Sequence, residues 1–185
     1  MSLFRSKVCP DGYSLFNESC YGGPGRDVLN WDDARAACVE LTTTFASFHL
    51  DFDLVSIHSD EENLFVHNIP HNGYFLLGFR RDAGETNFTW SDESHVDYTK
   101  WCDDYPDNDV STIIFGISHY LRFPTLTPNF ILTYLIMIFL KMSEDACAQM
   151  VYVNHLGVVW VDNECVIPST DQYHYLCKGV YIGKF

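Results

Sequence analysis

Seven cysteines carry the clearest chemistry in this chain of 185 residues. None of them belongs to a Cys-x-x-Cys pair, which is the spacing typical of zinc ribbons and thioredoxin-like redox sites. They cluster toward the two ends of the chain among aromatic and polar residues, and this setting favours disulfide bonds over buried reduced thiols. Together they are Cys9, Cys20, Cys38, Cys102, Cys147, Cys165 and Cys177.

Two N-glycosylation sequons indicate the same oxidising, secretory route, Asn17-Glu18-Ser19 and Asn87-Phe88-Thr89. We therefore expect a secreted, extracellular glycoprotein, because disulfide bonds form and persist outside the reducing cytosol. Residues 1–10 lack the apolar segment of a signal peptide. We expect that the chain lacks its true N-terminus or is one domain of a longer protein.

The formal net charge of -14 limits the classes of partner. A chain this acidic repels phosphate backbones and anionic lipid surfaces, so we expect neither nucleic acid nor an acidic membrane as its partner. Most of the 25 acidic side chains should form a solvated surface, although carboxylate oxygens are also the ligands that calcium takes.

The motifs of common enzyme classes are missing from the sequence. It has neither a Gly-rich phosphate loop nor a nucleophile-elbow motif around a serine or cysteine. His67 and His71 are four residues apart, a spacing that would place both on one face of a helix. Pro70 breaks such a helix between them, so we expect no shared metal site and we predict a binding domain.

Two helices followed by short strands should position these residues. Asn30 is the expected N-cap of the first helix, and Ser59 and Glu62 form a capping box that opens a second helix through about Val66 or Asn68. Short strands are expected at 54–57, 74–79, 88–90, 149–153, 158–161 and 173–177. This order predicts an α+β domain.

Residues 110–143 differ sharply in composition from the acidic chain around them. The segment has no acids and no cysteines, and its longest apolar run, 130–140, is too short to span a bilayer. It is either an inserted loop that extends a binding face or a translated intron. The apolar and aromatic composition, typical of translated AT-rich non-coding DNA, favours the intron.

Short motifs follow one another along the chain: CPDGYSLFNESCY, NWDDARAACVEL, DLVSIHSDEENLFV, FLLGF, FTWSDESHVDYTKW, DDYPDN, EDACAQM, WVDNEC and YHYLCKG. In this order they resemble the C-type lectin-like domains, especially the secreted ones of invertebrates. The match covers roughly residues 9–178 when 110–143 is set aside. Residues 1–8 would then be an N-terminal extension and 179–185 a C-terminal tail.

The resemblance implies an α+β C-type lectin-like fold with two helices, two small antiparallel sheets and a long ligand-binding loop. It also implies three disulfide bonds, Cys9–Cys20, Cys38–Cys177 and Cys147–Cys165. The pair farthest apart in sequence, Cys38–Cys177, should be the most stabilising in the chain-entropy view. Cys102 is left over beside Trp101, as a capped thiol or as half of an intermolecular disulfide.

The family binds sugar through calcium, held by Glu-Pro-Asn in the long loop, an acid before the third bridge cysteine, and Asn-Asp after a tryptophan. Here the first motif becomes Tyr105-Pro106-Asp107, for which the resemblance implies a cis peptide bond, and the last becomes Trp160-Val161-Asp162. Candidate sugar contacts are Tyr105, Pro106, Asp107 and Asp162. Candidate calcium ligands are Asp107, Glu144, Asp145 and Asp162.

Two substitutions put the calcium in doubt, because the ion takes about six to eight oxygen ligands. Tyr105 and Val161 stand where the family has a glutamate and an asparagine, which favours a loop that no longer holds the ion. Tyr105, Tyr98 and Trp101 could still form an aromatic surface, although for Trp101 we favour packing. We therefore predict an extracellular carbohydrate- or glycoprotein-binding domain with a partly degenerate calcium site, serving immune surveillance by family analogy. The alternative is a calcium-independent protein-binding module.

Overall fold

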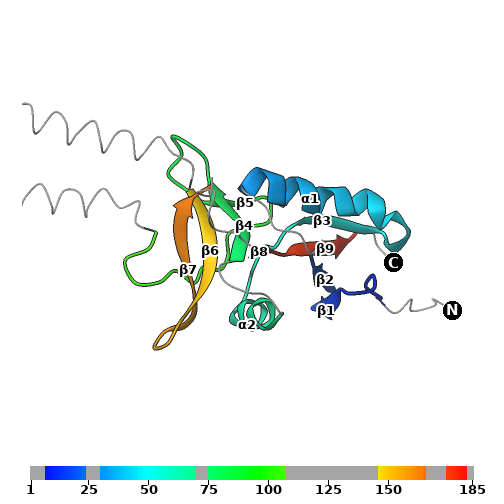
Figure 1. Cartoon of the computed structure of the whole chain (residues 1–185), viewed down its shortest axis with the longest axis horizontal. Helices are drawn as coiled ribbons and strands as arrows, with labels where there is room; N and C mark the ends of the chain where they lie inside the picture. The colour runs from blue at the N-terminus through cyan, green and yellow to red at the C-terminus, as the bar shows by residue number, and fades with distance from the viewer. Residues whose placement is uncertain (1–6, 24–29, 70–74, 107–145, 166–173, 183–185) are drawn as a thin grey trace, which may run out of the picture.

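The computed structural model describes residues 7–23, 30–69, 75–106, 146–165 and 174–182, with only the backbone for Asn163 and Glu164. These described residues form two α-helices and two sheets, and Figure 1 shows α1 lying over one sheet with α2 on the opposite side of the molecule. The predicted α+β class is confirmed. The segment 110–143 lies outside the described residues, so its origin stays a prediction.

The first sheet takes β1, β2, β3 and β9, and the second takes the strands from β4 to β8 that lie between them in the chain. The helices are α1 (Trp31–Thr44), the 3-10 turn η1 (Ala46–Phe48) and α2 (Asp60–Asn68). The strands are β1 (Ser14–Phe16), β2 (Ser19–Gly22), β3 (Leu50–Leu54), β4 (Phe75–Arg81), β5 (Thr89–Trp90), β6 (Ala146–Val153), β7 (Gly157–Glu164), β8 (His174–Tyr175) and β9 (Cys177–Tyr181).

Both helices begin at the predicted caps. The Asn30 side chain accepts a hydrogen bond from Asp33 N at 2.7 Å, and Ser59 Oγ accepts one from Glu62 N at 3.1 Å. In a capping box the Glu62 side chain would accept a hydrogen bond from the backbone N–H of Ser59. Here the Glu62 carboxylate accepts from His58 N instead, at 2.8 Å. Glu62 therefore fixes the residue that precedes the cap.

The strand predicted at 54–57 is wrong in its position. β3 ends at Leu54, where its pairing with β9 ends. Val55 N then donates to Leu176 O, and Val55 O accepts from Gly78 N, both at 2.9 Å. The apolar residues after Leu54 are thus buried at the passage from one sheet to the other, which a local apolar run does not distinguish from a strand.

The first sheet has the order β1-β2-β9-β3, and the second runs β5-β4-β6-β7 with β8 beside β4. All these pairings are antiparallel except that of β8, which pairs with β4 in parallel. The predicted pair of antiparallel sheets is therefore confirmed apart from β8. Neither helix in the described part of the chain is long and apolar enough to cross a membrane.

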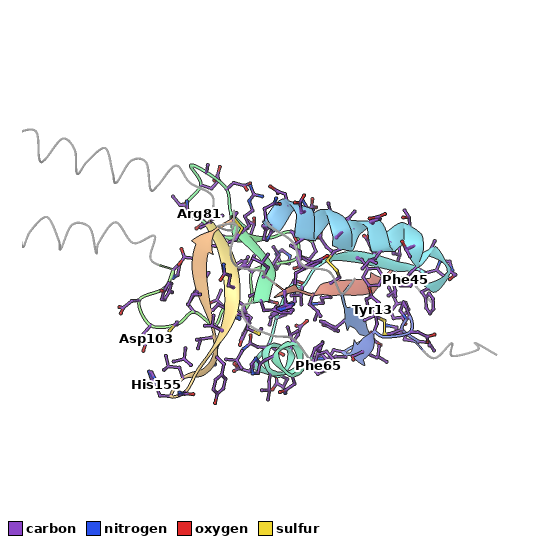
Figure 2. The ribbon with its side chains drawn as sticks, viewed as in Figure 1. Tyr13, Phe45, Phe65, Arg81, Asp103 and His155 are labelled. Carbon is purple, nitrogen blue, oxygen red and sulfur yellow. A yellow bond between two sulfur atoms is a disulfide. The ribbon has the colours of Figure 1, made fainter. Side chains whose placement is uncertain are left out.

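Aromatic rings fill the cores under both sheets. In the first, α1 packs against β3, and Phe52 lies so close over Gly179 that an added Cβ would meet its ring at 2.6 Å. Tyr13 and Phe45 meet edge to face at the end of α1, with ring centroids 5.3 Å apart (Figure 2). Burial raises the pKa of Tyr13 to about 12.

Three disulfide bonds join the pairs that the resemblance implies, Cys9–Cys20, Cys38–Cys177 and Cys147–Cys165. The second links α1 to β9 across 139 residues of sequence. The two ends of the described chain also meet, because Tyr181 Oη donates to Val8 O at 2.9 Å. One disulfide bond thus ties α1 to β9, and another ties the segment before β1 to β2.

Candidate functional site

The predicted binding loop begins on the edge of the second sheet. Trp160 N, in β7, donates to Lys100 O at 2.7 Å, and Cys102 N donates to Trp160 O at 2.8 Å. Trp101 forms an isolated parallel bridge with Trp160 between these bonds. The segment that follows, residues 101–106, which we call the binding loop, therefore starts from a fixed position on β7.

Trp160 in turn is fixed by α2. Its ring is fully buried, and its Nε1 donates to Asn63 Oδ1 at 2.8 Å. Asn63 Nδ2 donates to Val158 O at 3.2 Å, so one buried amide ties α2 to β7 at two points. The frame beneath the binding loop thus includes buried polar groups of Asn63, Trp160 and Val158 that bond one another.

Beyond Cys102 the binding loop is exposed. Tyr105 N donates to Cys102 O at 3.0 Å, and the Tyr105-Pro106 peptide bond is cis, as the resemblance implies. Tyr105 is 39% exposed, and Asp103, which Figure 2 labels in this loop, is also exposed. The loop therefore presents an aromatic ring and carboxylates to solvent next to a rigid strand.

Of the four candidate calcium ligands the structure describes Asp162. It lies on β7, two residues after Trp160, and is 8% exposed. Asp107, Glu144 and Asp145 lie outside the described residues. Within the described ranges no three His, Cys, Asp or Glu side chains gather closely enough to hold a metal ion. Val161 offers no side-chain oxygen, so among the described residues Asp162 is the one carboxylate of the predicted ligand set.

The three aromatic residues predicted near the loop have different roles. Trp101 is half-buried against Phe88, with ring centroids 5.0 Å apart, and Tyr98 packs against Trp160 at 5.6 Å. Burial raises the pKa of Tyr98, and so does the hydrogen bond that its hydroxyl donates to Asp60. Trp101 and Tyr98 thus support the loop, and Tyr105 alone of the three is exposed.

The remaining predicted sites are two exposed asparagines and one half-buried cysteine. Asn17 is exposed in the turn between β1 and β2, and Asn87 is exposed just before β5. Cys102 is a half-buried free thiol at the start of the binding loop. Both asparagines are exposed to solvent, and the backbone N–H of Cys102 bonds the edge strand β7.

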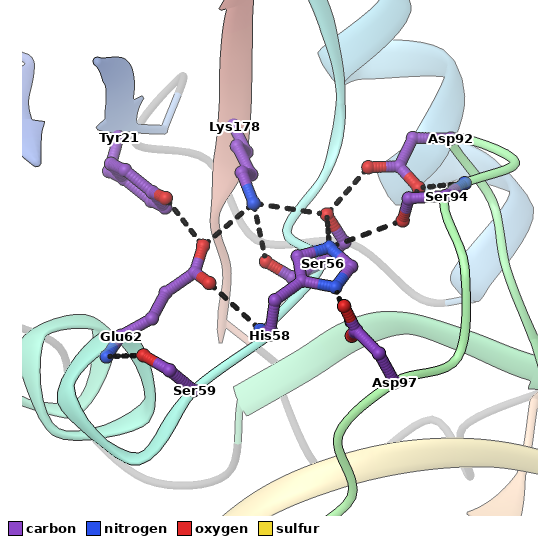
Figure 3. Close-up of polar contacts among 9 residues, drawn as sticks. All are labelled: Tyr21, Ser56, His58, Ser59, Glu62, Asp92, Ser94, Asp97 and Lys178. Atoms are coloured by element: carbon purple, nitrogen blue, oxygen red, sulfur yellow. Dashed lines mark hydrogen bonds and ion pairs between the residues drawn. The ribbon is translucent and has the colours of Figure 1, made fainter. Parts of the chain in front are cut away.

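A second polar cluster lies where β3 leads into α2 (Figure 3). Lys178 Nζ, buried on β9, donates to Glu62 Oε1 at 2.7 Å and to Ser56 O at 3.1 Å. Tyr21 Oη donates to the same Glu62 oxygen at 2.5 Å, and burial and this bond raise the Tyr21 pKa. Sequence reasoning missed this cluster, although the lysine directly after Cys177 was a signal for it.

His58 extends the cluster toward the segment that precedes the binding loop. Its Nδ1 lies 2.7 Å from Asp97 Oδ1, and its Nε2 lies 3.2 Å from both Ser56 Oγ and Ser94 Oγ. The two serine hydroxyls donate to Asp92, each at 2.5 Å. The serine, histidine and aspartate therefore do not form a nucleophile with its base, because each hydroxyl proton is held by Asp92.

The family model described as "Lectin C-type domain" matches residues 27–113. The low affinity immunoglobulin epsilon Fc receptor of Homo sapiens is 34% identical over 106 residues, which are 57% of this chain and 30% of the receptor. Echinoidin of Heliocidaris crassispina is 26% identical over 181 residues, 92% of this chain and 95% of echinoidin. The chain spans 30% to 62% of the length of four relatives, the receptor among them.

The fold of the chain is also similar to that of solved structures. The C-type lectin CEL-I of Cucumaria echinata superposes with a TM-score of 0.62 at 25% identity, covering 94% of this chain and 98% of CEL-I. The two helices, the two sheets and the three disulfide bonds described above are thus those of a known fold.

Proposed function

Because the chain carries a C-type lectin-like domain, we propose that it binds carbohydrate outside the cell through the binding loop, residues 101–106. The observation that carries this proposal is the exposed Tyr105 ring on a loop whose start is bonded to β7. An exposed aromatic ring offers an apolar face on which a sugar ring can stack. Asp162 and, beyond the described residues, Asp107 would supply acceptors for sugar hydroxyls.

Calcium binding is a separate part of the proposal. Asp107, Glu144, Asp145 and Asp162 are the candidate ligands, and a calcium ion held by them would orient sugar hydroxyls. Asp162 alone cannot supply the roughly six to eight oxygens that the ion takes. We therefore assign the direct sugar contacts to the chain itself and leave the contribution of calcium to be measured.

Calorimetry decides between a kept and a lost calcium site. Calcium is titrated into the protein and into the Asp162→Ala variant at about millimolar concentration, the weak end of the range for protein sites. Heat from the protein that is absent from the variant would support the site. Absence of heat from the unaltered protein would reject it.

A protein ligand is the second candidate function. Tyr105 and Val161 favour it, because both remove oxygens that a sugar-binding calcium site would use. One relative is named as a receptor for immunoglobulin, which is a protein ligand for a chain containing this domain. In this alternative the same exposed loop contacts a protein without calcium.

A glycan array separates the two functions. The protein is applied with calcium and with a chelator, beside the Tyr105→Ala variant and a control, Tyr152→Ala, which removes a 61% exposed tyrosine from β6. Sugar binding that Tyr105→Ala abolishes and Tyr152→Ala preserves supports the proposal. Binding to no glycan under either condition rejects it in favour of a protein ligand.

Three further proposals concern secretion, glycosylation and the free cysteine. We propose that residues 9–178 form the secreted domain, that Asn17 and Asn87 carry glycans, and that Cys102 forms an intermolecular disulfide. Enzymatic deglycosylation tests the two glycans. Non-reducing electrophoresis tests the intermolecular disulfide, because a Cys102→Ser variant should lose the covalent dimer. A transcript read across residues 110–143 tests whether the segment is a retained intron.

A further inference from the structure

The His58 ring lies between two parts of the chain that are far apart in sequence. His58 and Ser56 belong to the passage from β3 to α2, whereas Asp92, Ser94 and Asp97 belong to residues 91–100. Figure 3 shows the ring lying between Asp97 on one side and the two serines on the other. Residues 91–100, which we call the support segment, lead directly into the binding loop.

The distances assign the protons around this ring. Each serine hydroxyl lies 2.5 Å from an Asp92 oxygen but 3.2 Å from His58 Nε2. The shorter, charge-assisted bond takes the single proton of each hydroxyl. His58 Nε2 therefore faces two oxygens that can only accept, and Nδ1 faces the Asp97 carboxylate at 2.7 Å. Both ring nitrogens are required to donate, which an imidazole does only in its protonated form.

We propose that His58 is a positioning residue that, as an imidazolium, holds the support segment on the junction of β3 and α2. The support segment carries Lys100, whose carbonyl oxygen binds Trp160 N at the start of the binding loop. The proton on His58 would thereby help to fix the position of the loop. The inference rests on the proposed function only in treating residues 101–106 as a binding loop.

The charges around the ring agree with a cation. Asp97 contacts it directly, and the hydrogen bond from His58 is the largest cause that lowers the pKa of Asp97. Asp92 adds a second negative charge through the serines, and His95 is a further group near Asp97. Lys178 reaches Ser56 from β9, but its charge is paired with Glu62 on α2. The Trp90 ring, 5.9 Å away, covers one side without adding charge.

Deprotonation should loosen the support segment. A neutral ring would present a lone pair either to the Asp97 carboxylate or to the two serine oxygens. One serine would then have to turn its proton away from Asp92, or the Asp97 bond would be lost. The support segment should therefore be held more firmly while the His58 ring carries both protons.

Nitrogen NMR of the unaltered protein tests the protonation directly. In a sample labelled at histidine, we expect both His58 nitrogens to have imidazolium shifts at about pH 6, with His155 as an exposed reference in the same spectrum. A neutral His58 tautomer under these conditions would overturn the inference. No ligand is used, so failure here is distinguishable from failure to bind sugar.

Amide hydrogen exchange tests the positioning. The protection of Glu93 and Ser94, corrected for intrinsic rates, is compared between the protein and His58→Gln at about pH 6 and about pH 9. Because Asp97 is 60% exposed, we expect about a two- to fivefold loss of protection in the variant at the lower pH and none at the higher. The proposal would be contradicted if the protein and the variant differed in protection by the same factor at both pH values. An equal loss of protection in the control His155→Gln would contradict it as well.

Discussion

The first sheet and the binding loop are held in different ways. The sheet is fixed by two disulfide bonds, by the buried Lys178–Glu62 pair and by strands from both ends of the chain. The binding loop starts from backbone hydrogen bonds to β7 and then exposes Tyr105. Stability thus resides mainly in residues distant from the loop, so the loop sequence can change, as at Tyr105, without loss of the fold.

The largest effect should come from the long-range disulfide. Replacing Cys38 and Cys177 by alanine should lower the free energy of unfolding by about 5 kcal/mol, because 139 residues separate the pair. Removing Cys9–Cys20, with a separation of 11, should cost a little under about 3 kcal/mol. Urea unfolding measures both, and equal losses would mean that loop length does not set their contribution.

Breaking the buried ion pair should have the next largest effect. Glu62→Ala leaves the Lys178 ammonium buried without its carboxylate and should cost about 3–5 kcal/mol in urea unfolding. The double change Glu62→Leu with Lys178→Met should cost less, because no charge remains unpaired. If the double variant were less stable than Glu62→Ala, the Lys178–Glu62 ion pair would itself be a net stabilising interaction.

A small overpacking effect is expected at Gly179. An alanine Cβ there would meet the Phe52 ring at 2.6 Å, so Gly179→Ala should destabilise the first sheet by about 1–3 kcal/mol. Thermal unfolding measures the loss. Val180→Ala, at the next and 47% exposed position of β9, is the control and should stay within about 0.5 kcal/mol.

The smallest effect on stability should come from the binding loop itself. Tyr105→Ala should change the free energy of unfolding by no more than about 0.5 kcal/mol, since its ring is 39% exposed. The same variant should lose ligand binding on the array. A loss of stability comparable to that of Gly179→Ala would show that Tyr105 is part of the core, and the contrast between the two regions would fail.

The helices could be predicted from signals within a few residues of sequence. The wrong or missing predictions concern features that depend on contacts between residues far apart in sequence. Asn30 and Ser59 each bond a nearby amide, so their roles could be read from sequence. The strand at 54–57 was misplaced because its end depends on β9, which is more than 120 residues away in sequence, as the Leu54–Cys177 pairing shows. The cluster around Lys178 was missed for the same reason. Asp107, Glu144 and Asp145, the finer part of the site, lie outside the described residues.

The contact between Tyr181 and Val8 suggests that the protein could be circularly permuted. Since the described ends lie side by side, a short linker could join Lys7 to Ile182 without disturbing β1 or β9. The chain could then be opened at the exposed turn of residues 154–156, between β6 and β7. Such a circular permutant would keep every strand pairing of the first sheet while turning the β6–β7 hairpin into a pair of termini.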